Sequence, residues 1–239
     1  MLTSHVADSR LPVPSTHPVR SGQDDCAPAR ATVQPGSLLL RKRLSYWYQK
    51  LRILKYRLFS TCRTVEGTPI LAQPVQMVGQ GTIRFKGAVH FGVFPCPHWL
   101  SSYTYLEARY ENSVIEIEDD VWINNGCVLL SGGPGIRIGK HSMLGWNCEV
   151  MDTDIHDTHP GRRISGVPRS APVVIGENVM IGSNVKIFKG VTIGDNSVVS
   201  NGTVVTRSIP PNTLVYGNPA RGGRLPDSSR WTAPPTVAP

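Results

Sequence analysis

Residues 173–205 read VVIGENVMIGSNVKIFKGVTIGDNSVVSNGTVV, and this stretch repeats one small unit of sequence. A large aliphatic residue recurs at every sixth position: Ile175, Ile181, Ile187, Ile193, Val199 and Val205. Most of the residues four positions after each aliphatic are small or β-branched. A period of six fits neither an amphipathic helix nor the two-residue alternation of an ordinary strand. It predicts a solenoid of short parallel strands, in which each side points one aliphatic side chain inward.

The same phase extends upstream, in Ile117, Ile123 and Leu129, in Ile138, Leu144 and Val150, and more weakly in Met77, Ile83 and Val89. Three sides of six residues make a triangular coil, and stacked coils bury the aliphatic side chains as ladders. The pattern resembles the hexapeptide-repeat left-handed β-helix, an exception to the right-handed rule for parallel crossovers. We therefore predict a mainly β protein, a left-handed parallel β-helix of hexapeptide repeats with an N-terminal basic helix and an extruded catalytic loop.

Breaks in the period locate loops, where function is often found. The interval from Val150 to Ile175 is far longer than six residues, and a second long interruption separates Val89 from Ile117. We predict a β-helix domain over residues 64–222 with loops near 90–116 and 151–171. The flanking segments 1–37 and 223–239 lack a hydrophobic period, so we expect both to be disordered. Residues 38–63 are expected to form a separate basic amphipathic helix.

The basic segment has the spacing of one helical face between residues 38 and 59. Its large apolar residues are separated by three or four positions: Leu40, Leu44, Trp47, Leu51, Leu54 and Leu58. Arginine and lysine fill much of the rest, and no acidic residue occurs between 38 and 63. Two interpretations remain open. The helix packs on the main domain with a solvated basic face, or it lies on an anionic membrane surface.

Composition bears on whether the protein is disulfide-bonded, zinc-binding, membrane-spanning or secreted. The five cysteines are odd in number, widely spaced and never in a CxxC pattern, which favours a reduced cytoplasmic chain over a disulfide framework or a zinc site. No apolar run approaches the roughly 20 residues that span a bilayer. The N-terminus lacks the features of a secretion signal. We expect a cytoplasmic protein, with peripheral attachment to the inner membrane as a variant, and no nucleic-acid partner, although the net charge is +8.

The loop near 151–171 begins MDTDIHDTHPGRR, which sets His156 and His159 beside several aspartates. Three chemistries use such residues. A metal site would combine imidazole and carboxylate ligands, but apart from His141 no further histidine is placed to join it. Nucleophilic catalysis needs an activated serine or cysteine, and the loop offers no such motif. The third is general-base catalysis by a histidine on an acceptor hydroxyl.

The loop motif and the ending PVVIGENV…IPPNTLVYGNPAR resemble the acetyl-CoA-dependent O-acetyltransferases of the hexapeptide-repeat superfamily, including the maltose, galactoside and exopolysaccharide enzymes. The resemblance runs from about Ile117 to Arg221. It implies that His156 is the general base and that Asn125, His159 and Asp154 bind the acceptor, with Asn124 as the second choice for the Asn125 role. The chain departs from the family pattern at Gly132 and Gly133, where an acidic residue is expected, and at Met180, where an aromatic residue is usual.

For the donor, the resemblance implies acetyl-CoA as co-substrate, held along the last coils between subunits of a homotrimer. The backbone N–H of Ser183 would face the thioester oxygen. Asn201 and Thr206 would line the pantetheine arm, and Arg207 and Arg221 would lie near the phosphates. No metal is expected.

The function that this resemblance implies is transfer of an acetyl group from acetyl-CoA to a sugar hydroxyl, in the synthesis of a surface polysaccharide such as exopolysaccharide, capsule or O-antigen. One alternative is an acyltransferase that acts on a streptogramin-type antibiotic or a nucleotide-linked amino sugar. The alternatives from other classes are a non-catalytic β-helical scaffold and a metal-dependent hydratase.

Overall fold

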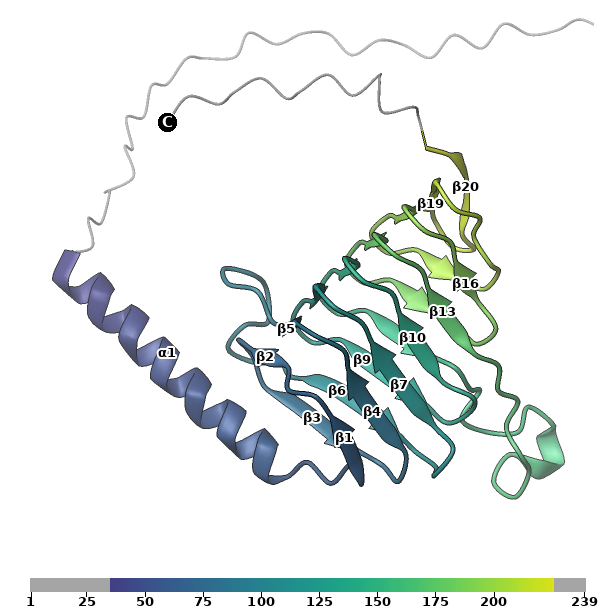
Figure 1. Cartoon of the computed structure of the whole chain (residues 1–239), viewed down its shortest axis with the longest axis horizontal. Coiled ribbons are helices and arrows are strands. Elements are labelled where there is room, and N and C mark those ends of the chain that lie inside the picture. The colour runs from purple at the N-terminus through teal and green to yellow at the C-terminus, as the bar shows by residue number, and fades with distance from the viewer. Residues whose placement is uncertain (1–34, 226–239) are drawn as a thin grey trace, which may run out of the picture.

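The computed structural model describes residues 35–225, as one N-terminal helix followed by a stack of short strands (Figure 1). Helix α1 spans Pro35–Leu58. The predicted disordered tails lie almost entirely outside the described residues. The exceptions are residues 35–37, which begin α1, and residues 223–225, of which 223 and 224 end the last strand.

Three sheets form the three sides of the stack, and all but one of their strand pairs are parallel. Sheet A contains β1 (Thr64–Glu66), β4 (Thr82–Phe85), β7 (Val114–Ile117), β10 (Ile136–Ile138), β13 (Val173–Ile175) and β16 (Thr192–Ile193). Sheet B contains β2 (Ile70–Leu71), β5 (Val89–Phe91), β8 (Val121–Ile123), β11 (Met143–Leu144), β14 (Met180–Ile181), β17 (Val198–Val199), β19 (Thr213–Tyr216) and the antiparallel β20 (Arg221–Arg224). Sheet C contains β3 (Val75–Val78), β6 (Thr104–Ala108), β9 (Val128–Ser131), β12 (Glu149–Met151), β15 (Lys186–Ile187) and β18 (Val204–Val205).

The register confirms the predicted phase. Each sheet stacks its sixth-position aliphatics in one buried ladder. The ladders are Ile117–Ile138–Ile175–Ile193 in sheet A, Ile123–Leu144–Ile181–Val199 in sheet B and Leu129–Val150–Ile187–Val205 in sheet C. The chain passes from sheet A to B to C and back to A in each coil. Each coil therefore has three corners, which are the turns from sheet A to B, from B to C and from C to A.

Asparagine makes several of these corners. Asn178, Asn184 and Asn196 have φ values of 53°, 58° and 57°, in the left-handed region that asparagine tolerates better than most residues. Equivalent corners also bond to one another, because the side chain of Asn178 donates to Asn196 at 2.9 Å. Asparagine thus lets the backbone turn tightly where the chain passes from one sheet to the next.

Helix α1 is present as predicted, but the packing interpretation chose the wrong face. The predicted packing residues Leu40, Leu44, Trp47, Leu51, Leu54 and Leu58 are 52–73% exposed. The buried side chain is Gln49, which is 2% exposed and donates to the carbonyl of Trp99 at 2.6 Å. Arg52 donates to the carbonyl of Ser102 at 2.6 Å. The loop at 92–103 turns the carbonyls of Trp99 and Ser102 toward α1. These carbonyls need hydrogen-bond donors, so α1 packs there through polar side chains rather than through its apolar face.

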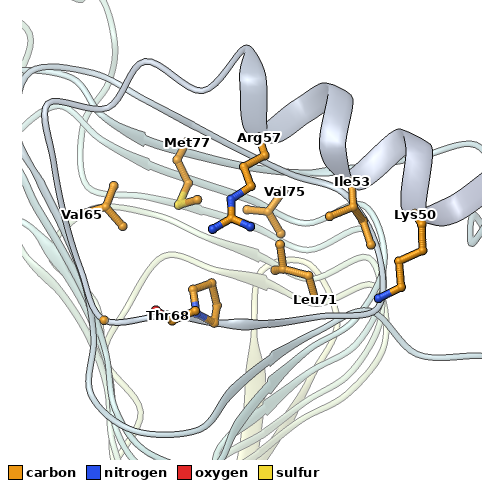
Figure 2. A pocket seen from close by; sticks show the side chains of 10 residues that line it. Lys50, Ile53, Arg57, Val65, Thr68, Leu71, Val75 and Met77 are labelled. Carbon is orange, nitrogen blue, oxygen red and sulfur yellow. The ribbon is translucent and has the colours of Figure 1, made fainter.

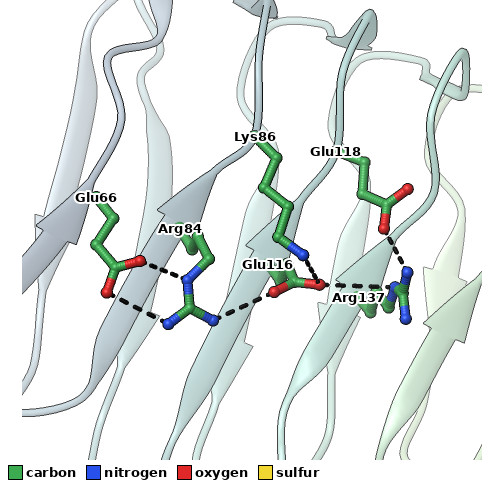
Figure 3. A network of polar contacts seen from close by, with 6 residues as sticks. All are labelled: Glu66, Arg84, Lys86, Glu116, Glu118 and Arg137. Carbon is green, nitrogen blue, oxygen red and sulfur yellow. Dashed lines mark hydrogen bonds and ion pairs between the residues drawn. The ribbon is translucent and has the colours of Figure 1, made fainter.

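A ladder of charges covers the outer side of sheet A (Figure 3). Arg84 lies between Glu66 and Glu116, at 2.5 Å and 3.2 Å, and Lys86 reaches Glu116 at 2.8 Å. The hydrogen bond from Lys86, together with that from Arg84, holds the pKa of Glu116 below its usual value although burial opposes this. A carboxyl with a lowered folded-state pKa stabilises the fold above its unfolded pKa, and that stabilisation is lost as the pH falls through the folded value.

We therefore expect Glu116→Gln to lower the free energy of unfolding by about 1 kcal/mol at pH 7, the upper range for ion pairs at a protein surface. The variant should also lose less stability than the parent when the pH falls below the ordinary glutamate value of 4.5. Glu111→Gln is the matched control, because Glu111 contacts only the exposed Arg63. Denaturant unfolding at pH 7 and pH 4 measures both effects. Equal losses in the two variants would show that the ladder adds nothing.

Candidate functional site

The loop over residues 152–171 leaves the stack at a C/A corner, between β12 and β13, and projects from the β-helix (Figure 1). Its stem is closed by antiparallel backbone contacts, which join Asp152 to Ala171, Thr153 to Ser170 and Asp154 to Arg169. This pairing gives the loop a fixed base on the rigid coils. The loop tip carries a short 3₁₀ helix, η1 (Pro160–Arg162).

Asp152 anchors the stem to the neighbouring turn. Its buried carboxylate accepts hydrogen bonds at 2.8 Å from the hydroxyl of Ser131 and from the backbone N–H groups of Gly132 and Gly135. A Cβ atom at Gly133 would lie 2.3 Å from the Cβ of Ser170. The acidic residue that the family pattern expects here therefore has no room, and the buried carboxylate of this corner comes from the loop instead.

The imidazole of His156 is exposed and oriented by a single backbone contact. Its Nδ1 lies 3.1 Å from the carbonyl oxygen of Arg163. A carbonyl can only accept, so Nδ1 carries the hydrogen of the neutral ring and Nε2 keeps a free lone pair. The preceding Ile155 has φ 65°, an unfavourable conformation for a β-branched residue. The loop therefore presents a base at Nε2, on locally strained backbone of the kind that clusters at functional sites.

His159 is used differently. Its Nδ1 accepts the backbone N–H of Gly161 at 3.2 Å and so caps η1. The backbone N–H of His159 donates to Oδ1 of Asp157 at 2.8 Å. In the neutral ring, Nε2 then carries the hydrogen and can only donate. This geometry favours His156 over His159 as a base and leaves His159 a structural cap with one exposed donor.

Two of the predicted acceptor-binding residues are already engaged. The carboxylate of Asp154 forms an ion pair with Lys189, at the same corner of the next coil, which ties the loop to the stack. The amide of Asn125 is fully buried and is bonded to Val93 through both its oxygen (3.2 Å) and its nitrogen (3.1 Å), and to Pro97 (2.9 Å). Their assignment to the acceptor stays a prediction, and in this conformation both side chains are engaged within the chain. Both hold loops in place.

The neighbouring Asn124 lines a groove on the outside of sheet B. This groove of about 390 Å³ is also lined by Val93, Trp122, Met143, Gly145 and Met180. Trp122, Met143 and Met180 are consecutive in the register of β8, β11 and β14, so they form one exposed apolar column. The aromatic residue missing at Met180 thus occurs in the same column at Trp122. Sequence reasoning missed this column because its members are neither adjacent nor sixth-position residues.

The predicted donor residues fall at different places. Ser183 and Asn201 meet at the B/C corner of adjacent coils, where the Ser183 N–H donates to Oδ1 of Asn201 at 2.7 Å. In this conformation the N–H of the predicted oxyanion donor is therefore occupied by Asn201, and its role toward the thioester stays a prediction. Thr206 and Arg207 follow β18 at a C/A corner, on the same edge as the His156 loop. Arg221 lies in β20, opposite Tyr216.

His156 and the sheet B groove lie on different corners of one chain. The loop leaves a C/A corner, whereas Asn124 and Ser183 occupy B/C corners, so a whole side of sheet C separates them. Six residues at about 3.3 Å each make that side roughly 20 Å long. At the loop tip, Ile164 is 98% exposed and Val167 is 84% exposed. In one chain, the candidate base and the groove are thus carried by different corners, and no residue of the His156 loop lines the groove.

The alternative chemistries find little support in the described part of the chain. Within residues 35–225, no three histidine, cysteine or acidic side chains gather as a metal-binding group. Cys127 and Cys148 are buried at B/C corners. The neighbouring thiol of Cys148, together with complete burial, raises the pKa of the Cys127 thiol well above its ordinary value. A reactive cysteine needs a lowered pKa and access to solvent, so Cys127 does not suit the role of a nucleophile.

Comparison with known proteins agrees with this architecture. The family model described as the hexapeptide repeat of succinyl-transferase matches residues 172–207. A Dictyostelium discoideum relative is 40% identical over 107 residues, 45% of this chain and 55% of that protein. A Saccharomyces cerevisiae relative is 39% identical over 109 residues, 46% of this chain and 55% of that protein. Both are provisionally named acetyltransferases. This chain thus spans about half the length of the curated relatives that it matches.

Among solved structures, the polysialic acid O-acetyltransferase OatWY has a TM-score of 0.50 and 24% identity, over 68% of this chain and 84% of that chain. This likeness concerns the fold. Together with the three parallel sheets and the matched repeat, it confirms the predicted left-handed parallel β-helix of hexapeptide repeats. The chain thus carries a hexapeptide repeat over residues 172–207, folds as a left-handed β-helix, and is similar over about half of its relatives' length to proteins named as acetyltransferases.

Proposed function

We propose that the protein transfers an acetyl group from acetyl-CoA to a hydroxyl of a sugar, in the synthesis of a surface polysaccharide. The observation that carries this proposal is the orientation of His156, whose Nδ1 is fixed by the Arg163 carbonyl so that Nε2 is free to accept a proton. The provisional names of the relatives support acetyl transfer, and the sugar acceptor follows the resemblance to sugar acetyltransferases.

In the proposed reaction, His156 Nε2 removes the proton of the acceptor hydroxyl as its oxygen attacks the thioester carbonyl. The tetrahedral intermediate then expels the thiolate of coenzyme A, which takes the proton back from the imidazolium. Ser183 can donate to the developing oxyanion once the Asn201 side chain turns away from its N–H. The exposed side chains of Arg207 and Arg221 would attract the phosphates of the donor.

The groove on sheet B suits a sugar acceptor. Pyranose rings have an apolar face and a polar edge, and the column of Trp122, Met143 and Met180 offers an apolar wall beside the amide of Asn124. Asn124 is therefore the proposed acceptor residue: its Oδ1 accepts the backbone N–H of Asn125 at 2.7 Å, and its amide NH₂ group would donate to the acceptor. His159 keeps one donor, Nε2–H, that can reach a second hydroxyl.

The acetylation proposal is tested with acetyl-CoA and a panel of mono- and oligosaccharides. Release of the coenzyme A thiol should depend on the sugar, and mass spectrometry should find one acetyl group on a sugar oxygen. Acetylation of an amino sugar nitrogen would replace the proposal with the nucleotide-sugar alternative. A chain that binds no coenzyme A would support the scaffold alternative.

We further propose a homotrimer in which one subunit supplies the His156 loop and its neighbour supplies the groove. The separation of the two features within one chain supports this, as does the exposure of Ile164 and Val167, which a neighbour would cover. We expect His156→Ala and Asn124→Ala to be inactive alone and partly active when co-expressed, because mixed trimers contain intact shared sites. Activity assays on dual-tagged trimers measure this. Mixed trimers as inactive as their parents would show that each site lies within one chain.

A further inference from the structure

The outer face of α1 is an apolar stripe with no partner in the described structure. We define this stripe as Leu40, Leu44, Trp47, Leu51, Leu54 and Leu58. With 3.6 residues per turn, these side chains fall within a sector centred opposite the buried Gln49. The stripe therefore lies on the side of α1 opposite the residue that is buried against the loop at 92–103. Exposed apolar surface of this extent marks an interaction site.

Basic residues border the stripe on both sides. At about 100° per residue, Arg43, Lys50 and Arg57 lie along one edge, and Arg41 and Lys55 lie along the other. All five side chains are exposed, and α1 contains no acidic residue. The whole outer half of the helix thus combines an apolar centre with cationic margins, the arrangement of helices that lie in a membrane interface.

A pocket opens on the same cationic flank. It has a volume of about 440 Å³, lies between α1 and the first coil, and is lined by Ile53, Leu71, Val75 and Met77. Figure 2 shows Lys50 and Arg57 descending from α1 beside this apolar space. Apolar volume next to two cations complements a molecule with an apolar chain and an anionic headgroup.

We propose that α1 docks in the plane of an anionic lipid surface, with the stripe in the boundary between headgroups and acyl chains. Charge decides against a second copy of this helix as the occupant. Two stripes packed face to face would bring cationic margins together with no acid from either helix. A membrane-spanning orientation of α1 does not fit either, because no helix within residues 35–225 is long and apolar enough to cross a membrane. This inference does not depend on the proposed reaction.

The test uses the full chain and vesicles of phosphatidylcholine with or without phosphatidylglycerol. We expect co-sedimentation with the anionic vesicles at low salt, release at high salt, and a blue shift of Trp47 fluorescence that is absent from Trp47→Phe. Leu51→Gln should weaken binding about tenfold or more. Leu39→Gln is the matched control, because Leu39 and Leu51 are both 64% exposed but only Leu51 lies in the stripe. The control should change binding little.

Charge is tested separately. Lys50→Gln combined with Arg57→Gln should weaken binding to anionic vesicles roughly 20- to 30-fold, from about fivefold per cation near the surface. Arg224→Gln, in β20, is the control for a remote cation. The proposal fails if the full chain ignores anionic vesicles, or if Leu51→Gln and Leu39→Gln behave alike. It also fails if Leu51→Gln lowers the oligomeric state without lipid, which would show that another copy covers the stripe.

Discussion

His156→Ala is expected to lower the rate of acetyl transfer about 10²- to 10⁴-fold, the usual range for loss of a general base. The fold should survive, because the His156 ring is exposed and contacts only the Arg163 carbonyl. The acetylation assay measures the rate, and thermal unfolding with size-exclusion chromatography confirms that the loop variant is folded and assembled. His141→Ala, at an exposed corner that pairs with Asp120, is the control for a histidine elsewhere.

Two further variants separate proton transfer from loop structure. His156→Asn places an amide N–H near the position of Nδ1, where it can donate to the Arg163 carbonyl, but it has no base, so it should be as inactive as His156→Ala. His159→Ala removes the cap of η1, which costs about 1 kcal/mol locally, and should reduce activity much less. If His159→Ala proves the more damaging change, the base has been assigned to the wrong histidine of the loop.

The fold could be predicted from the sequence because one simple constraint is repeated. Each side of the coil needs one inward aliphatic, so Ile175, Ile181 and Ile187 carry the same information as every later repeat. Which face of α1 packs on the β-helix could not be predicted in this way. Helical periodicity shows that an apolar face exists but not what it contacts. Burial of Gln49 depends on the carbonyl of Trp99, in a loop whose path the repeat does not determine.

The site residues remain predictions. His156 is singled out by its loop and by the family resemblance, and the structure adds the contact that orients its ring. The roles of Asn125 and Ser183 depend on which partners have already taken their hydrogen-bonding groups. For Ser183 a signal existed, because Asn201 follows it by 18 residues, one full coil, and must lie beside it. For Asn125 there was none, since its partners come from the irregular loop that begins at Val93.

Ile181→Asp is expected to prevent folding, because it places a charge in the middle of the sheet B ladder. Ile181 is 2% exposed and lies between Leu144 and Val199 in the register. The aspartate would lose the burial of the aliphatic chain and would have no cation within the ladder to pair with, and either an ionised or a protonated carboxyl is costly there. A loss above about 4 kcal/mol approaches the whole stability of an ordinary domain.

The adjacent Met180 supplies the control, since it belongs to the same strand but is 49% exposed on the outer face. Met180→Asp should give soluble protein with cooperative unfolding close to that of the parent, and any loss should appear in acceptor use. Ile181→Val tests the same position without charge and should cost about 0.5–1.5 kcal/mol. Soluble yield and circular dichroism melts of the three variants measure the contrast. Normal yield and melting of Ile181→Asp would contradict the assigned phase. At a ladder position the side chain must point into the core, so the coil could not turn the charge outward to solvent.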